Sequence, residues 1–153
     1  MNRNMKRILW IIITLCHSLW VWSQEGLQVA TLFDGPYKKK HNAIEVLVKG
    51  EQLSAYHLTL FRSLTIKDDS VAFKDIERCI RADAKKAIDK EEGMFGQELY
   101  YGFYCFPPQK EQNRYLFYRN AYLKERGKPE VTTVYMEGYA TMDELKKMFK
   151  KNR

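Results

Sequence analysis

The feature that most constrains this chain is a series of three strand-like segments in its second half. They cover residues 99–106, 114–123 and 131–137, and each is rich in tyrosine, phenylalanine or β-branched residues. The connections between them are short and polar, and each contains proline. Such connections are too short for the crossover that joins parallel strands, so successive segments are expected to run antiparallel. The pattern predicts a three-stranded β-meander.

The first half of the chain adds two further strands. Residues 44–48 and 58–66 are rich in β-branched or large apolar side chains, and both segments end at polar residues typical of turns. Together with the meander they predict an antiparallel sheet of about five strands, with two strands before the meander and three in it.

Helices are expected in three places. Apolar residues recur every three or four positions between residues 73 and 88, which predicts a long helix that ends at residues 91–93. Residues 26–37 fit both strand and helix spacing, and we favour a short helix there. Thr141 and Glu144 form the pattern of a capping box, which predicts a final helix. The predicted fold class is α+β, with two or three helices packed on one face of the sheet.

The beginning of the chain predicts a secretory leader. Basic residues precede an apolar run at residues 8–15, and the small side chain of Ser23 precedes Gln24. We interpret residues 1–23 as a cleaved signal peptide and residues 24–153 as a single domain. An uncleaved anchor is the alternative, but polar residues interrupt the run before it reaches the ~20 apolar residues that span a bilayer. We therefore expect a periplasmic or secreted protein without a stable membrane span after cleavage.

The leader also bears on lipid anchoring and on the net charge. Lipid attachment at Cys16 is not expected, because the large Leu15 stands where a lipoprotein signal has a small residue. The leader carries three basic residues and no acidic one, so its removal lowers the net charge from +7 to +4. A charge this modest does not indicate a nucleic-acid partner, and we expect none.

Cys79 and Cys105 are the two cysteines that follow the leader. An even number of cysteines in an oxidising compartment permits a disulfide between them. The alternative is two buried thiols that do not meet. Both alternatives stay open at this point.

Tyrosine and phenylalanine are concentrated in the meander. Ten of the 18 such residues lie between Phe95 and Tyr122. The alternation of side chains along strands places Tyr104, Tyr115 and Tyr135 on the sides expected to face away from the helices. Tyrosine suits contact surfaces because it combines apolar area with a polar tip, so these three are candidate binding residues. Plain packing in the sheet is the alternative, since aromatic residues are favoured in strands anyway.

Lys38, Lys39 and Lys40 form a short basic run, which could attract an anionic glycan or a phospholipid surface. The alternative is a solvated loop. With the tyrosines, the run suggests an unknown envelope protein or a glycan as partner. A homodimer formed through the meander is a further possibility.

The sequence shows no recognisable catalytic or metal-binding motif. His41 and His57 stand 16 residues apart, without cysteines or carboxylates at the spacing of a zinc site. A nucleophile formed by Cys105 and His57 is disfavoured, because aromatic surroundings make a thiol inert. We therefore expect no catalytic residue, no metal and no cofactor. A non-enzymatic binding module is favoured, and an enzyme whose site is assembled from dispersed residues is the alternative.

The end of the chain resembles a known group of proteins. Residues 132–145, Thr-Thr-Val-Tyr-Met-Glu-Gly-Tyr-Ala-Thr-Met-Asp-Glu-Leu, are similar to the strand, glycine and capped helix of small secreted Bacteroidetes domains of unknown function. The segments at residues 46–50 and 58–64 add to the likeness. The resemblance implies a periplasmic or envelope location and carries no catalytic residues.

Overall fold

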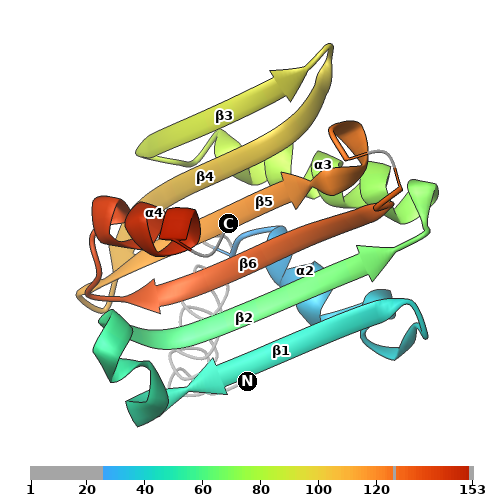
Figure 1. Cartoon of the computed structure of the whole chain (residues 1–153). Helices are drawn as coiled ribbons and strands as arrows, with labels where there is room; N and C mark the ends of the chain where they lie inside the picture. Colours follow the sequence, from blue (N-terminus) through green and yellow to red (C-terminus); the bar gives the residue numbers. More distant parts are fainter. Residues whose placement is uncertain (1–25, 126, 152–153) are drawn as a thin grey trace, which may run out of the picture.

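The computed structural model describes residues 26–125 and 127–151, so the expected signal peptide and Cys16 lie outside the described residues. Six strands form one antiparallel sheet in the spatial order β1-β2-β6-β5-β4-β3 (Figure 1). The strands are β1 (Ala43–Lys49), β2 (Leu58–Lys67), β3 (Asp89–Phe95), β4 (Glu98–Gln109), β5 (Gln112–Asn120) and β6 (Glu130–Gly138). The α+β class and the meander of β4, β5 and β6 are confirmed, and β6 also pairs with β2.

The expected count of about five strands is wrong, because β3 is a sixth strand. The predicted long helix, α3 (Ser70–Ala84), ends earlier than the apolar spacing suggested. Ala87 and Ile88 continue that spacing by chance, and the chain then pairs with β4 through a tight turn at Gly96 and Gln97. Because β3 is a highly charged edge strand that buries almost nothing, it lacks the apolar alternation by which strands are recognised.

Helices cover both faces of the sheet, so the expectation of helices on one face is also wrong. Figure 1 shows α2 (Val29–Asp34) and α3 behind the sheet and α4 (Met142–Lys151) in front of it. The described residues also form three short 3₁₀ helices, namely η2 (Pro36–Lys39), η3 (Gly50–Tyr56) and η4 (Ala121–Leu123). The strands of the meander carry apolar side chains on both faces, and each face therefore needs a cover.

The larger core lies between the sheet and the α2–α3 pair. It buries the apolar stripe of α3 against side chains from β2, β4, β5 and β6; among its members are Phe33, Leu64, Ile66, Phe73, Ile76, Ile80, Tyr104, Phe106, Leu116, Tyr118 and Val131. The amide of Ala72 donates to the Asp69 carboxylate 2.9 Å away, which caps α3. This core fixes α2 and α3 against one face of the sheet.

The smaller core lies under α4. It contains the buried residues Leu53, Leu58, Phe103, Tyr115, Phe117, Val134, Met136, Ala140 and Leu145. Because α4 has only ten residues, it covers part of this face and leaves the strip over β1 and β2 open (Figure 1). Within the described part of the chain, no helix is long and apolar enough to cross a membrane.

Candidate functional site

The structure does not bring the three candidate tyrosines together. Residues directly opposite in antiparallel strands share a face. Tyr104 pairs with Leu116, which pairs with Tyr135, so these lie on the α3 face. Tyr115 pairs with Cys105 and therefore lies on the α4 face.

Each of these tyrosines has a structural partner in the fold. Tyr104 is fully buried and its hydroxyl donates to Glu92 Oε1 over 3.0 Å. The hydroxyl of Tyr115, which is also buried, donates to the carbonyl of Ala140. The half-buried Tyr135 donates to Glu137 Oε1 over 2.8 Å. The three side chains therefore share no exposed surface.

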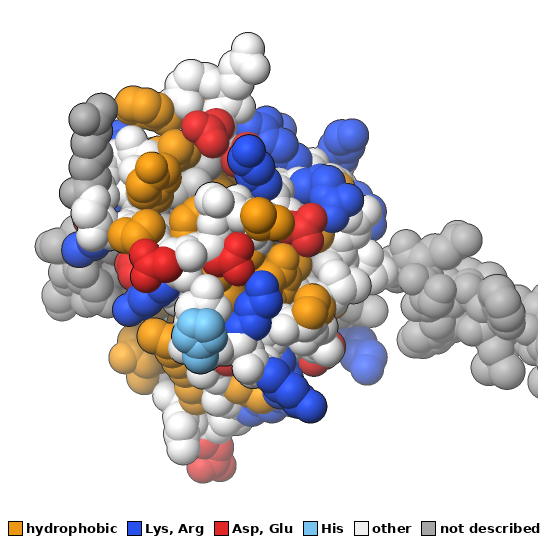
Figure 2. All heavy atoms as spheres, turned by 90° about the vertical axis from the view of Figure 1, so that its right-hand side faces the viewer, with side chains coloured by type: hydrophobic (Ala, Val, Ile, Leu, Met, Phe, Trp, Pro, Cys, Tyr) orange, Lys and Arg blue, Asp and Glu red, His pale blue; other side chains and the backbone are white. Residues whose placement is uncertain are grey.

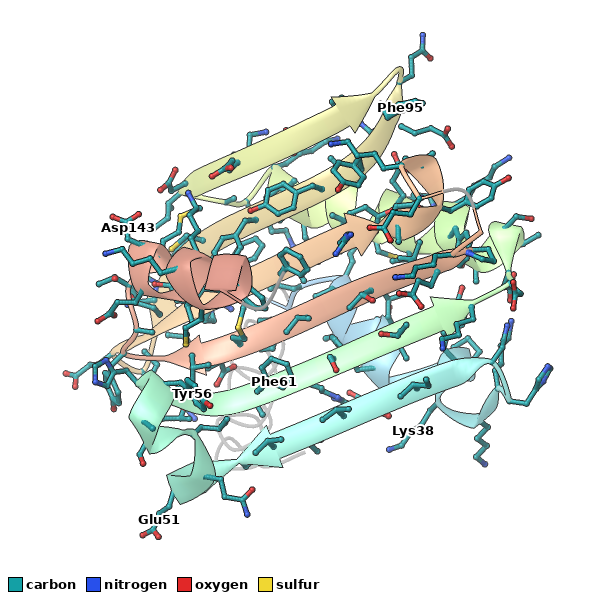
Figure 3. The ribbon with its side chains drawn as sticks, viewed as in Figure 1. Lys38, Glu51, Tyr56, Phe61, Phe95 and Asp143 are labelled. Carbon is teal, nitrogen blue, oxygen red and sulfur yellow. The ribbon has the colours of Figure 1, made fainter. Side chains whose placement is uncertain are left out.

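The lysine run lies at the end of the sheet away from η3. Lys38 and Lys39 are exposed on η2, and Figure 3 shows Lys38 pointing away from the sheet. Lys40 forms an ion pair with Asp69 over 3.0 Å and lies 5.2 Å from the centre of the Tyr37 ring, so it helps to hold η2 against α3. Figure 2, which looks at this end, shows basic side chains interspersed with acidic and hydrophobic ones. The run and the tyrosines form no common site.

Both cysteines are free thiols in the structure. Cys79 packs against the α3-side core and Cys105 against the α4-side core, so the sheet separates them. Burial raises the pKa of each thiol above its usual value. A raised pKa keeps a thiol protonated and unreactive at neutral pH.

The histidines show no arrangement of a metal site. Among the described residues, no group of three His, Cys, Asp or Glu side chains could hold a metal ion. His57 Nδ1 lies 3.6 Å from Glu144 Oε1 at the exposed start of α4. Its position indicates a role in holding the helix.

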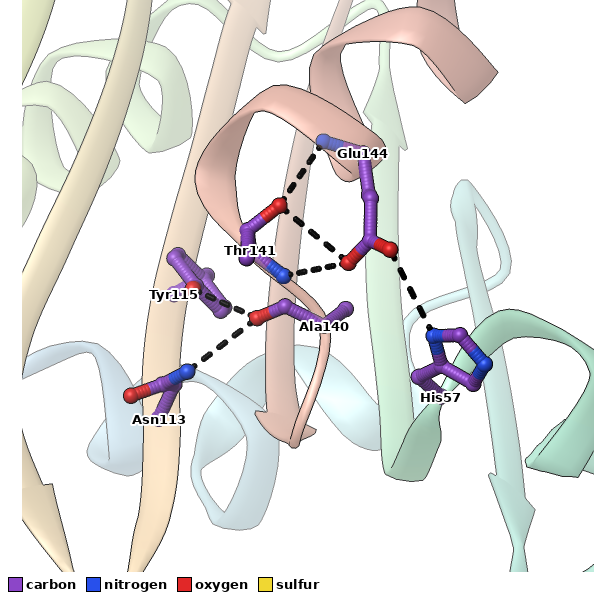
Figure 4. Close-up of polar contacts among 6 residues, drawn as sticks. All are labelled: His57, Asn113, Tyr115, Ala140, Thr141 and Glu144. Atoms are coloured by element: carbon purple, nitrogen blue, oxygen red, sulfur yellow. Dashed lines mark hydrogen bonds and ion pairs between the residues drawn. The ribbon is translucent and has the colours of Figure 1, made fainter.

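The start of α4 is fixed to the sheet by a compact set of polar contacts (Figure 4). The amides of Tyr139 and Ala140 both donate to the carbonyl of His57, at 2.7 and 3.0 Å. From β5, Tyr115 Oη and Asn113 Nδ2 donate to the carbonyl of Ala140 at 2.7 and 3.2 Å. Burial raises the pKa of Tyr115 to about 12, so its hydroxyl remains a donor throughout the physiological range.

The predicted capping box of α4 is confirmed. The amide of Thr141 donates to Glu144 Oε2 over 2.7 Å, and the amide of Glu144 lies 3.3 Å from Thr141 Oγ1 (Figure 4). These bonds, chiefly the one from the Thr141 amide, hold the pKa of Glu144 below its usual value of 4.5. The helix is therefore joined to the sheet at its first turn by contacts of defined geometry.

We expect acid to weaken this junction. A carboxylate whose folded-state pKa is lowered stabilises the fold above its unfolded-state pKa and loses that contribution as the pH falls through the folded value. In the Glu144→Gln variant, urea unfolding should therefore lose less stability between about pH 5 and pH 3 than in the native chain. Glu51→Gln, at an exposed position in η3, is the matched control and should follow the native chain. Equal pH slopes for the native chain and Glu144→Gln would contradict the prediction.

The hollowed part of the α4 face is an aromatic groove. Phe149 of α4 stacks on Phe117 of β5, with ring centres 4.9 Å apart and planes 6° from parallel. Tyr101 meets Phe117 edge-on at 5.6 Å, and Phe103 meets Phe149 at 6.2 Å. Phe117 and Phe149 line two half-open hollows, one toward β3 and one toward β6. We call the stack and these hollows the phenylalanine groove.

The β3-side hollow has a volume of about 310 Å³. Its apolar wall comes from Met94, Tyr100 and the aromatic cluster. Lys124 Nζ lies 4.3 Å from the centre of the Tyr100 ring, and Lys146 forms an ion pair with Glu91 over 2.7 Å. The hollow thus combines an aromatic floor with a charged rim.

The β6-side hollow is larger, about 550 Å³. Arg119 and Lys128 both pair with Glu125 at its rim. The Nε of Arg119 is buried and finds no hydrogen-bond acceptor among the described residues. A buried donor without an acceptor carries a cost that a ligand oxygen would remove.

Sequence reasoning missed the phenylalanine groove because it placed all helices on one face. Phe149 fits the apolar stripe of the final helix, and Phe103 and Phe117 fit alternating strand positions, so each looked like an ordinary core residue. The signal that could have found them was the apolar character of both faces of the meander. Two apolar faces require two covers, and a ten-residue helix is too small to close one of them.

Comparisons with known proteins place the chain by family alone. Comparison with the curated proteins and with the solved structures finds no match. One family model matches residues 16–149, which is most of the chain. The chain belongs to that family, DUF6108, a family of unknown function.

Proposed function

We propose that this protein is an exported, non-enzymatic binding module of the cell envelope, and that the phenylalanine groove holds a segment of a partner protein. The observation that carries the proposal is the Phe117–Phe149 stack, which lies beside two hollows that α4 leaves half-open. Hollows of this size accept large side chains or a short peptide segment.

The composition of the groove favours a protein partner. Protein interfaces place aromatic anchors at the centre and charged side chains at the rim. The phenylalanine groove has this order, with the phenylalanines on the floor and Lys124, Lys146, Lys128 and acidic residues around it. The Arg119 donor suits a backbone carbonyl or a carboxylate of the bound segment.

Non-enzymatic function is supported by the chemistry of the described residues. A thiol with a raised pKa is a poor nucleophile, and both cysteines are of this kind. In the β3-side hollow, Lys146 is paired with Glu91, and in the β6-side hollow Arg119 is paired with Glu125. Because these charged side chains are already held in ion pairs, they are better suited to the rim of a contact surface than to proton transfer.

Export is supported by the basic start and apolar run that precede Gln24. Export is tested first, in the same cells that are used for the crosslinking experiment. Cells that express the full chain are fractionated, and the mass of the recovered protein is measured. We expect it in the envelope fraction with residues 1–23 removed.

We expect a photo-crosslinking residue at Lys124, on the rim of the groove, to capture a partner protein in these cells. The same residue placed at Lys74, which is exposed on α3 on the opposite face, should not capture it. Adding Phe149→Ala should remove the crosslink at position 124, because it removes half of the aromatic stack. The products are read by mass spectrometry.

Phe95→Ala is the matched control for Phe149→Ala. Phe95 is 55% exposed at the turn between β3 and β4, outside the groove, and Figure 3 shows its position. Its replacement should leave the crosslink unchanged, and circular dichroism should show both variants folded. Identical products from positions 124 and 74, or a crosslink that survives Phe149→Ala in a folded chain, would overturn the proposal.

A further inference from the structure

The two edges of the sheet differ in how they are protected against pairing with another chain. Free strand edges offer unpaired amides and carbonyls, and proteins usually guard them with charges and bulges. The edge strand β3 begins with Asp89, Lys90, Glu91 and Glu92 and has a register shift at Gly93, so it is guarded in both ways.

The opposite edge, β1, is less protected, because it has no bulge and only Glu45 and Lys49 are charged. Its sequence is Ala-Ile-Glu-Val-Leu-Val-Lys, without proline, and it pairs with β2 in unbroken register. Ile44 is 52%, Val46 43% and Leu47 50% exposed, although all three are large apolar residues on a strand. Such a strand is typical of a pairing surface.

The hydrogen-bonding pattern shows which backbone groups of β1 point outward. The amide of Lys67 in β2 donates to the carbonyl of Asn42, and bonded pairs alternate along an antiparallel ladder. Residues 44, 46 and 48 therefore direct their backbone groups toward β2. Glu45, Leu47 and Lys49 direct theirs to the open edge.

We propose that β1 pairs antiparallel with β1 of a second copy of this chain, about a two-fold axis at Leu47. This register brings the outward backbone groups of residues 45, 47 and 49 together. It sets Glu45 of each copy opposite Lys49 of the other and Leu47 opposite Leu47. On the other face of the sheet, Val46 of each copy lies opposite Val48 of its partner.

Charge complementarity is what selects this occupant and this register. Lys49 is exposed and has no acidic partner among the described residues. Glu45 Oε1 accepts from Arg62 Nε over 2.9 Å, which leaves Oε2 for Lys49 of the partner copy. A register moved by one pair, centred on Val46, sets Glu45 against Leu47 and uses the amide of Ala43, which already donates to Lys40.

The proposed dimer uses a different strand from the meander dimer expected from the sequence. Within the sheet, the outer strand of the meander, β4, is covered by β3, so its edge is not free. The β1 pairing instead forms one sheet through both copies. It leaves the phenylalanine groove of each copy open, because that groove lies at the far half of the sheet.

The solution mass of the protein, purified from cells that express the full chain, tests the pairing. Light scattering over a range of concentrations should show a monomer–dimer equilibrium. Leu47→Lys places two lysines across the axis, and Lys49→Glu creates two pairs of like charges. Each variant should raise the dimer dissociation constant by about tenfold or more. Phe95→Lys, at an exposed position on the edge strand β3 and outside the phenylalanine groove, is the matched control and should not change it.

A crosslinking measurement tests the register. In the proposed dimer, Val46 of one copy and Val48 of the other form a pair without backbone hydrogen bonds. The Cα atoms of such pairs come within disulfide range. A mixture of Val46→Cys and Val48→Cys chains should oxidise to a disulfide-linked dimer, whereas either variant alone, like the native chain with its two thiols, should not. A native protein that stays monomeric at every concentration, a dimer insensitive to Leu47→Lys and Lys49→Glu, or crosslinking of Val46→Cys alone would overturn the proposal.

Discussion

Replacing Gly138 with alanine is expected to lower the free energy of unfolding by about 3 kcal/mol or more. Gly138 is the last residue of β6, and its backbone lies close to the start of β2 before the chain enters α4. A Cβ atom at this position would lie 2.5 Å from the carbonyl oxygen of His57 and 2.6 Å from Cα of Leu58. Both contacts are with backbone, so no side-chain rotation can relieve them.

The Gly138→Ala substitution should also affect the phenylalanine groove, because the close approach of Gly138 to the start of β2 also anchors α4. The carbonyl of His57 that would clash also accepts the amides of Tyr139 and Ala140. The backbone of residue 138 also has φ 156°, which adds strain for any residue with a Cβ. To make room, the strand would have to move away from β2 and carry the start of α4 with it. The variant should therefore lose partner capture through the phenylalanine groove as well as stability.

Gly93→Ala is the matched control for this prediction. Gly93 is also a strand glycine, but a Cβ there would lie 3.6 Å from the nearest atom, which is an ordinary contact. Its replacement should change stability by no more than about 0.5 kcal/mol. Urea unfolding followed by circular dichroism measures both variants. Equal stability losses in the two variants would contradict the prediction, because they would show that the backbone of His57 and Leu58 leaves room for a Cβ at residue 138.

Much of the fold could be predicted from the sequence because its signals are local. The β-branched runs identify β1 and β2, and the three- to four-residue spacing identifies α3. Thr141 and Glu144 identify the start of α4. What failed was decided by tertiary pairing. The strand β3 forms because it pairs with β4. It buries so few side chains that its sequence lacks the apolar alternation by which strands are recognised.

The candidate site was less predictable than the fold because it depends on the side of the sheet that each element takes. Tyr104 shows the difficulty. Its ring lies over Gly102, and a Cβ there would come within 2.4 Å of the tyrosine hydroxyl. The glycine thus makes room for the ring to lie along the sheet and reach Glu92, which is directly opposite Gly102. A tyrosine that alternation places on a strand face can be buried in this way without any change in its sequence pattern.

The second large effect is expected at Asp83, a contact that joins residues far apart in the sequence. Asp83 lies in the last turn of α3 and is fully buried. Its two carboxylate oxygens accept the amides of Gln28 and Val29, each over 2.8 Å. The helix α2 has no side-chain cap of its own, so Asp83 serves as that cap from another helix.

Replacing Asp83 with alanine should lower the free energy of unfolding by about 3 kcal/mol, since it leaves two amides at the start of α2 without acceptors. Asp83→Asn keeps one acceptor oxygen and should lose about half as much. Asp75→Ala removes an acidic residue from the same helix at a side chain that is 48% exposed, where it pairs with Arg78 and accepts the Tyr37 hydroxyl, and should cost only about 1 kcal/mol. Hydrogen exchange should show the amides of Gln28 and Val29 opening first in Asp83→Ala. Protection of these two amides equal to that in the native chain would contradict the capping role, because a cap that is removed cannot leave its donors protected.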